Sequence, residues 1–450
     1  MSVEIATANS SSREGQALQT LATDLLSRAR SAGASQAEVA VATGSGFSVQ
    51  VRKGEVETVE HHRDRSLDLT VYFGKRKGSA SSADFSAASV TATLDQACAI
   101  ARHTEADECH GLADAERMAH EFPDLDLWHP WALQVEAAIE LGRSIEAAGL
   151  AMDGVENSEG ASVDTGAGLS VYANSHGFVG SQRGTRHSMS CSLIARDGQG
   201  MQRDYWYDSR RCADELMDAA ELGRLAGERA VARVGARGLA TRKCAVLFTP
   251  DMARGLIGHL LAAVSGSALY RRASFLLDKA GHKILPDWLD IVEQPRLPRG
   301  QASTCFDAEG VATVESALVS GGVLQRYLLG SYSARKLGLS STGNAGGTHN
   351  IVVGHGDDDF EAMLRRMDTG LLVTELMGQG VSTITGDYSR GAAGFWVEGG
   401  AIAFPVEGVT IAANLKDMFA NLVAVGADID PRSSILTGSI LLESMTVAGE

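Results

Sequence analysis

The stretch LDLTVYFGKRKGSASS, residues 67–82, shows most directly how the chain folds, because its apolar and polar side chains alternate. The odd-numbered residues from 67 to 73 are all apolar, which is the two-residue period of a strand with one buried face. Gly74 and Gly78 bracket three basic residues, a composition typical of a hairpin turn, and a second extended segment follows at 79–82. The pattern therefore predicts antiparallel strands.

Segments with a helical period lie on both sides of this hairpin. Apolar residues at three- and four-residue steps predict a first helix from about Arg13 to Gly33. Further helices are predicted at 86–103, 131–148, 214–234, 250–264, 358–367 and after the N-cap residue Asn414. Strands are predicted at 188–194, 201–207, 244–248, 371–376, 381–385 and 440–447. Because helices and strands follow one another in mixed order, we expect an α+β fold with antiparallel sheets and not a doubly wound parallel sheet.

The length of the chain and a glycine-rich junction suggest its division into domains. A chain of 450 residues is long enough for two or three domains. Residues 1–15 are polar and rich in serine, so we expect a flexible N-terminal tail there. We expect an N-terminal α+β domain at 16–235 and a C-terminal α+β domain at 240–450, with the junction at 235–243 between them.

Composition excludes several classes of function. The net charge is −16, and basic residues gather only in short runs such as Lys75–Lys77 and Arg271–Arg272, so the sequence does not predict nucleic-acid binding. Six cysteines without a C-x-x-C pair indicate free thiols in a reducing compartment. No apolar stretch approaches 18 residues and no secretory signal is present, so we expect a cytoplasmic protein that does not enter a membrane.

A search for catalytic motifs finds no complete site. The sequence contains neither a P-loop nor a G-x-S-x-G elbow, and His120-Glu121 is followed by Pro123, which breaks any H-E-x-x-H helix. The set Cys98, His103, Cys109 and His110 fits no usual zinc module. His259 lies in an apolar helical segment, where a hydrogen-bonded core histidine is the ordinary interpretation.

Several long blocks of the sequence resemble the TldD/PmbA family. They are residues 374–398 (TELMGQGVSTITGDYSRGAAGFWVE), 270–278 (YRRASFLLD), 331–339 (SYSARKLGL), 74–82 and 173–177. The resemblance runs from about residue 18 to the C-terminus. It implies two intertwined α+β domains, a heterodimeric zinc peptidase of the cytoplasm with an internal chamber, and unfolded peptides as substrates. Microcin precursor maturation, antitoxin removal and an older description as a modulator of DNA gyrase are associated with the family.

The resemblance also implies where the zinc site of the TldD-type subunit would fall. The first ligand His falls on Gly258, the catalytic Glu on His259, the second ligand His on Ala263 and a late cysteine on Thr437. Glycine and alanine have no side-chain donor atoms, threonine is a poor zinc ligand, and no carboxylate remains to activate water. We therefore expect no metal and no catalytic residue in this chain, with zinc in its TldD-type partner.

Three functions stay open. The resemblance favours a non-catalytic partner subunit that is inactive alone, pairs with a TldD-type subunit and forms a homodimer when alone. A second function is a regulator that binds proteins such as gyrase. A third is a self-sufficient peptidase with a displaced site, for which the candidates are His176, His187 and Asp387 with Ser389.

Five polar side chains are candidates for contact with peptide or partner. They are Arg271, Gln379, Asp387, Tyr388 and Arg390. Loops on a rigid scaffold often carry binding groups, and an arginine can pair with a peptide carboxylate. The alternative for Asp387, Tyr388 and Arg390 is a structural turn between Gly386 and Gly391, and Gln379 is equally compatible with a tight turn.

Overall fold

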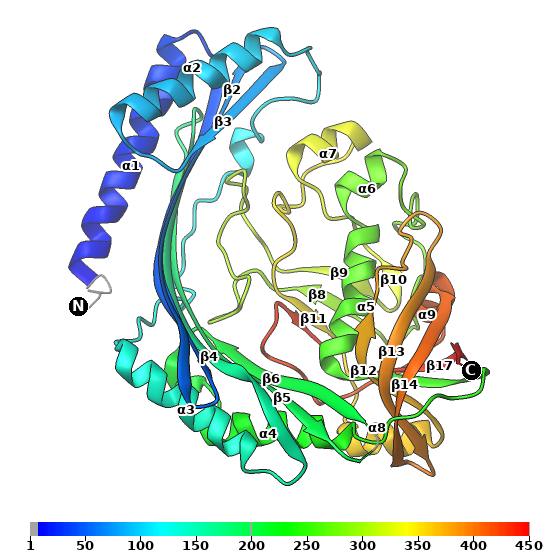
Figure 1. Cartoon of the computed structure of the whole chain (residues 1–450). Coiled ribbons are helices and arrows are strands. Elements are labelled where there is room, and N and C mark those ends of the chain that lie inside the picture. The colour runs from blue at the N-terminus through cyan, green and yellow to red at the C-terminus, as the bar shows by residue number, and fades with distance from the viewer. Residues whose placement is uncertain (1–7, 199, 450) are drawn as a thin grey trace.

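The first half of the chain builds one curved sheet in the computed structural model, which describes residues 8–198 and 200–449 (Figure 1). Its strands are antiparallel to their neighbours in the order β3-β2-β1-β4-β5-β6. They are β1 (Gln36–Arg52), β2 (Glu55–Phe73), β3 (Arg76–Ser82), β4 (Val155–Asn174), β5 (Val179–Arg196) and β6 (Met201–Arg210). The predicted hairpin is confirmed, because β2 and β3 pair and the apolar residues from 67 to 71 are fully buried.

Helices cover the convex face of this sheet (Figure 1). They are α1 (Ala8–Ser31), α2 (Ala87–His103), α3 (Val135–Leu150) and α4 (Ala219–Ala232), with 3-10 turns at Ala115–Arg117 and Ala213–Glu215. Two separate apolar cores result, one under α1 and α2 and one under α3 and α4. The helices α3 and α4 pack so closely that a Cβ on Gly223 would lie 1.9 Å from the Ile145 carbonyl oxygen. The concave face is left open toward the second half.

The second half is organised around a larger sheet in the order β14-β13-β12-β7-β17-β15. Its strands are β7 (Arg242–Phe248), β12 (Gly370–Met377), β13 (Asp387–Glu398), β14 (Ala401–Asn414), β15 (Leu422–Val425) and β17 (Ile440–Ala448). Because β14 also pairs with β17, five of these strands close into a ring. The pair β7–β12 is parallel, and the other pairs are antiparallel.

A smaller sheet and short helices complete the second half. The sheet has the order β10-β9-β8-β11-β16, with β8 (Ile291–Glu293), β9 (Ser316–Ser320), β10 (Val323–Leu324), β11 (Ile351–Val353) and β16 (Ile435–Leu436). The helices are α5 (Pro250–Ala263), α6 (Gly266–Tyr270), α7 (Ser331–Leu337), α8 (Phe360–Met367) and α9 (Leu415–Ala420). Within the described ranges no helix has both the length and the apolar character needed to cross a bilayer.

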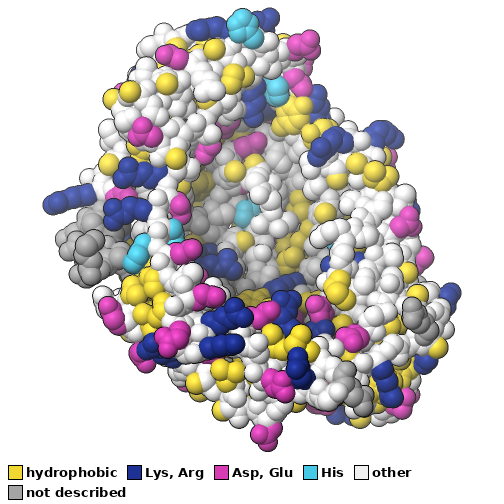
Figure 2. Space-filling model, in the orientation of Figure 1, with side chains coloured by type: hydrophobic (Ala, Val, Ile, Leu, Met, Phe, Trp, Pro, Cys, Tyr) yellow, Lys and Arg dark blue, Asp and Glu magenta, His cyan; other side chains and the backbone are white. Residues whose placement is uncertain are grey.

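The two halves interlock and leave a hollow between them. The segment that follows α2 crosses to the second half, where Met118 pairs with Val311 and Arg335 donates to the Leu112 carbonyl oxygen at 2.6 Å. At the other end, the Arg432 guanidinium lies 4.1 Å from the ring centroid of Trp206. Figure 2 shows the hollowed face between the halves, with Lys and Arg side chains along its lower margin.

Several expected boundaries differ from the structure. Residues 8–15, expected in the tail, belong to α1, and residues 1–7 lie outside the described residues. The helix expected from 214 begins at Ala219, because the Asp218 carboxylate caps the amides of Ala220 and Glu221. The strand expected at 381–385 is a tight turn closed by Ser382 and Asp387, with a positive φ at Gly386. Consequently the segment that begins at Asp387, for which a structural turn was one alternative, is strand β13.

Candidate functional site

Helix α5 carries three of the four positions at which the resemblance places metal chemistry: Gly258, His259 and Ala263. It follows β7 directly, and Pro250 at its first position begins the helix without leaving an unsatisfied amide. Its apolar side, with Leu256, Ile257 and Leu260, is buried in the main core of the second half. The opposite side, with Gly258 and His259, is only half-buried.

The three donor positions of the resemblance do not form a metal site. A Cβ on Gly258 would meet nothing within 4 Å, whereas Ala263 is fully buried. Neither glycine nor alanine has a side-chain donor atom for a metal. Thr437 is also fully buried, and its hydroxyl donates to the Gly438 carbonyl oxygen at 3.1 Å. These side chains do not fit a zinc ion.

No other metal site is assembled in the described part of the chain. Across residues 8–198 and 200–449, no three His, Cys, Asp or Glu side chains lie close enough together to hold an ion. The set Cys98, His103, Cys109 and His110 is therefore not a cluster: Cys98 is buried in α2, and the His110 ring lies 5.2 Å from the Tyr332 ring.

His259 contacts a tyrosine and an arginine from β13. The rings of His259 and Tyr388 lie 5.9 Å apart at 76°. Burial and the positive charge of Arg390 both lower the pKa of His259, so its ring is neutral at pH 7. Burial raises the pKa of Tyr388 to about 12, so its hydroxyl keeps its proton. His259, Tyr388 and Arg390 thus bring together neutral and cationic groups and no carboxylate.

Arg390 is the cation of this cluster. In the described residues it forms no ion pair, its Nη2 is 3.4 Å from the Leu376 carbonyl oxygen, and its buried Nε has no hydrogen-bond partner. A guanidinium without an ion pair has donors to offer to a carboxylate or a carbonyl. Tyr388 and Arg390 share one face of β13 because they are two residues apart.

The other three contact candidates lie apart from this cluster. Asp387 lies on the opposite face of β13, and its pKa is lowered by the Thr385 hydroxyl and then by Asn414, which donates at 3.1 Å. Gln379 is exposed in the loop that starts at Gly378. Arg271 is exposed at the end of α6, where its Nε donates to the Ser267 carbonyl oxygen at 2.8 Å.

The residues considered for a displaced peptidase site are not gathered into one. His187 is buried in the first half, where its ring nitrogens lie 2.9 Å from the Thr165 hydroxyl and 2.9 Å from the His129 carbonyl oxygen. Burial lowers its pKa, as expected for a neutral core histidine. His176 is exposed in the β4–β5 turn, and Ser389 belongs to β13 in the other half.

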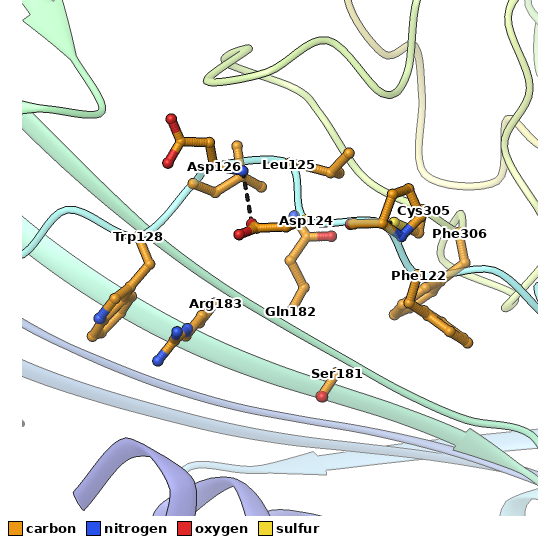
Figure 3. A pocket seen from close by; sticks show the side chains of 12 residues that line it. Phe122, Asp124, Leu125, Asp126, Trp128, Ser181, Gln182, Arg183, Cys305 and Phe306 are labelled. Atoms are coloured by element: carbon orange, nitrogen blue, oxygen red, sulfur yellow. Dashed lines mark hydrogen bonds between the residues drawn. The ribbon is translucent and has the colours of Figure 1, made fainter. Parts of the chain in front are cut away.

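A pocket of about 220 Å³ lies between the halves, and one of the residues that line it is a cysteine, Cys305 (Figure 3). The segment 122–128, β5 and the Cys305–Phe306 pair line it. The guanidinium of Arg183 lies 5.1 Å from the Trp128 ring, and Asp124 accepts the amide of Asp126 at 2.9 Å. Burial raises the pKa of the Cys305 thiol, which keeps it protonated and unreactive at neutral pH.

Sequence reasoning missed a larger cleft at the C-terminal end of α5. Its volume is about 550 Å³, and its lining includes Glu309, Tyr270 and Tyr332. These residues are 39 and 23 positions apart along the chain, so no local spacing could have brought them together. Tyr270 lay in a block that resembles the family, but that resemblance said nothing of Glu309.

The chain matches the models of one protein family along most of its length. Three models match consecutive parts of the chain: PmbA/TldA metallopeptidase domain 1 over residues 37–101, the central domain over 128–234 and the C-terminal domain over 241–449. The chain therefore belongs to the PmbA/TldD family of metallopeptidase-like proteins. The family resemblance and the mixed α+β fold are confirmed.

Individual relatives cover nearly the whole chain. Metalloprotease PmbA of Escherichia coli O157:H7 is 50% identical over 92% of each chain, and the Metalloprotease PmbA homolog of Haemophilus influenzae is 48% identical over 94%. A crystal structure from Bacteroides thetaiotaomicron, described as a candidate modulator of DNA gyrase, matches with a TM-score of 0.91 and 27% identity, covering 96% of this chain and 99% of that one. TldE from Thermococcus kodakarensis matches in fold, with a TM-score of 0.83, 22% identity, and 95% and 99% coverage.

Proposed function

We propose that this chain is the non-catalytic partner subunit of a TldD-type metallopeptidase. One observation carries the proposal: in an intact family fold, the positions for two ligands, the catalytic glutamate and the late cysteine hold Gly258, Ala263, His259 and Thr437. Gly258 and Ala263 have no side-chain donor atoms, and Thr437 is buried and hydrogen-bonded. The zinc and the general base would belong to the partner subunit, in the cytoplasm.

The hollow between the halves supports a role in peptide handling. The open concave face of the first sheet lies opposite α5 (Figure 1), and α5 carries the neutral His259, which contacts Tyr388 and lies in the field of the cationic Arg390. Such a surface admits an unfolded peptide and offers hydrogen-bond donors to its carbonyl and carboxylate groups. By resemblance, the substrates would be peptides of the kind found in microcin precursors and antitoxins. Arg271 and Gln379 would contact the peptide or the partner subunit.

The test is to purify the full chain alone and after coexpression with a TldD-type subunit. We expect one zinc ion per heterodimer, none in the lone chain, and cleavage of an unstructured peptide only by the pair. A TldD-type subunit with its catalytic Glu replaced by Gln should form an inactive pair. Stoichiometric zinc together with cleavage in the lone chain would refute the proposal.

The same purification tests the regulatory alternative. The description of the Bacteroides thetaiotaomicron structure as a candidate modulator of DNA gyrase is the observation that favours it. Recovery of gyrase with the tagged chain, in the absence of any TldD-type subunit, would support that function. Recovery of the TldD-type subunit, and of a homodimer when that subunit is missing, is what the partner role predicts.

A further inference from the structure

The cleft at the C-terminal end of α5 lies outside the cluster around His259. It has a volume of about 550 Å³ and is walled by α6, α7 and the loop 344–348. Ala262 of α5 is exposed at its edge, one helical turn after His259. The walls are mostly small residues and backbone, so the cleft has room for a main chain to approach.

Glu309 supplies the one carboxylate of this lining. The turn that holds it is fixed by Asp307, whose carboxylate accepts the amides of Glu309 at 2.9 Å, Val311 at 3.0 Å and Ala345 at 2.9 Å. One carboxylate oxygen of Glu309 accepts the Ser331 amide at 2.8 Å, which orients the group. The side chain is therefore held in place before any ligand arrives.

No cation neutralises Glu309 within the described residues. Lys336 pairs with Asp107 at 2.8 Å and lies 5.3 Å from the Tyr332 ring centroid, and Arg335 pairs with Asp114 at 3.1 Å. Arg271 lies 5.7 Å from the Tyr270 ring centroid, and no ion pair joins it to Glu309. The negative charge of Glu309 acts on two buried carboxyl groups, Glu38 and Asp307. Burial is the main cause that raises their pKa values, and the charge of Glu309 raises them further. The local field thus favours an added positive charge.

Two tyrosines give the cleft an aromatic wall. The rings of Tyr270 and Tyr332 lie 5.7 Å apart at 84°, and the Tyr332 hydroxyl donates to the Asp107 carboxylate at 2.9 Å. Aromatic rings beside a carboxylate suit an amine on a short carbon chain, because the rings cover its apolar part while the carboxylate takes its charge.

We infer that this cleft binds a primary ammonium group of a peptide, with Glu309 as the accepting carboxylate. The choice of a peptide rests on the proposed function, whereas the choice of an ammonium group rests on the unpaired, oriented Glu309 and the shape of its cleft. An N-terminal amine and a lysine side chain share this chemistry.

Fluorescence anisotropy on the full chain tests the inference. The probes are an unstructured heptapeptide without lysine, labelled at its C-terminus, its N-acetylated form, and the N-acetylated form with one lysine. We expect the free amine to bind about tenfold more tightly than the acetylated form, as for a charge-assisted hydrogen bond. Recovery of affinity by the lysine peptide would identify the side chain as a second source of the ammonium group.

Glu309→Gln keeps an oxygen for the Ser331 amide and removes the charge, so it should abolish the preference for the free amine. Glu315→Gln is the matched control, because Glu315 is exposed and lies outside the cleft. Ala262→Lys places a competing cation at the exposed edge of the cleft and should also remove the preference. This second variant keeps the test decisive if Glu309→Gln does not fold.

The effects of acetylation and of Glu309→Gln should not add, because both remove the same interaction. Equal affinity for the free and acetylated peptides, no binding of any probe at millimolar concentration, or a preference unchanged in both variants would overturn the inference. None of these results affects zinc content or cleavage by the pair, so the proposed function would stand or fall separately.

Discussion

Replacing the buried carboxylate of Glu293 in β8 should destabilise the second half in a pH-dependent manner. Glu293 is 2% exposed, and one of its oxygens accepts the Asn344 side-chain amide at 2.8 Å and the amide and ring nitrogen of His349 at 2.8 and 2.9 Å. Its other oxygen pairs with Arg326. Glu293→Gln keeps the shape of the side chain but leaves Arg326 without its buried counter-charge.

The magnitude follows from the pKa of Glu293. Burial raises it, but the hydrogen bonds from His349 and the charges of His349 and Arg326 outweigh burial and lower it from 4.5 to about 2. At about 1.36 kcal/mol for each pKa unit, this gap corresponds to about 3 kcal/mol of stability at neutral pH. Because the folded pKa is depressed, that stability is present above pH 4.5 and is lost as the pH falls through about 2.

Urea unfolding of the wild type and Glu293→Gln measures this difference. At pH 7 the variant should be less stable by about 3 kcal/mol, and at pH 3 the difference should shrink to about 1 kcal/mol. Glu443→Gln removes an exposed carboxylate and should change stability by less than about 0.5 kcal/mol at either pH. A difference that is equal at pH 7 and pH 3, or absent at pH 7, would refute the reasoning.

Two pairs of substitutions and one titration test other parts of the structure. Arg432→Ala should lower the free energy of unfolding by about 3–5 kcal/mol, because its 8%-exposed guanidinium pairs with Asp430 and stacks on Trp206. Arg366→Ala, which breaks an exposed pair, should cost less than about 1 kcal/mol, and equal effects of the two would contradict this. Gly258→Ala should stabilise α5 by about 0.5–1 kcal/mol, since its Cβ meets nothing within 4 Å. Gly394→Ala should destabilise by about 2 kcal/mol or more, because its Cβ would lie 1.9 Å from the Leu372 carbonyl oxygen; similar melting temperatures of the two glycine variants would show the packing argument to be wrong. Burial lowers the pKa of His187, so an NMR titration should place the midpoint of its ring below 6.5, and the stability it confers should fall as the pH drops below 6.5; a midpoint at or above 6.5 in the folded chain would exclude this.

The elements that the sequence predicted well are those with local signals. The Asn414 side chain caps α9 as expected by accepting the Lys416 amide at 3.1 Å, and α2 begins after Ser86 at the predicted place. The predicted strand at 381–385 failed for a tertiary reason. Its valine and threonines suit a strand, but the Ser389 amide donates to the Gly380 carbonyl oxygen at 2.7 Å and folds this segment back onto β13.

The site was predictable in one respect and not in another. The loss of metal donors is visible in the sequence, because glycine and alanine carry no donor atoms wherever they lie. The cluster of His259, Tyr388 and Arg390 needs the strand β13 to lie across α5, and no spacing reveals that. The cleft that contains Glu309 could not be predicted either, because it forms only where α6, α7 and the loop 344–348 come together in the fold.

The two charged sites lie next to each other along one side of α5. His259 and Ala262 are three residues apart, so they are neighbours on the helix surface. Ala262 borders the cleft of Glu309, and His259 contacts Tyr388 beside Arg390. A peptide has an ammonium group at one end and carbonyl oxygens along its length, so opposite charges at adjacent sites favour one direction of binding over the reverse. With its amine at Glu309, the peptide's following carbonyl groups would run toward Arg390, which would fix its orientation in the hollow.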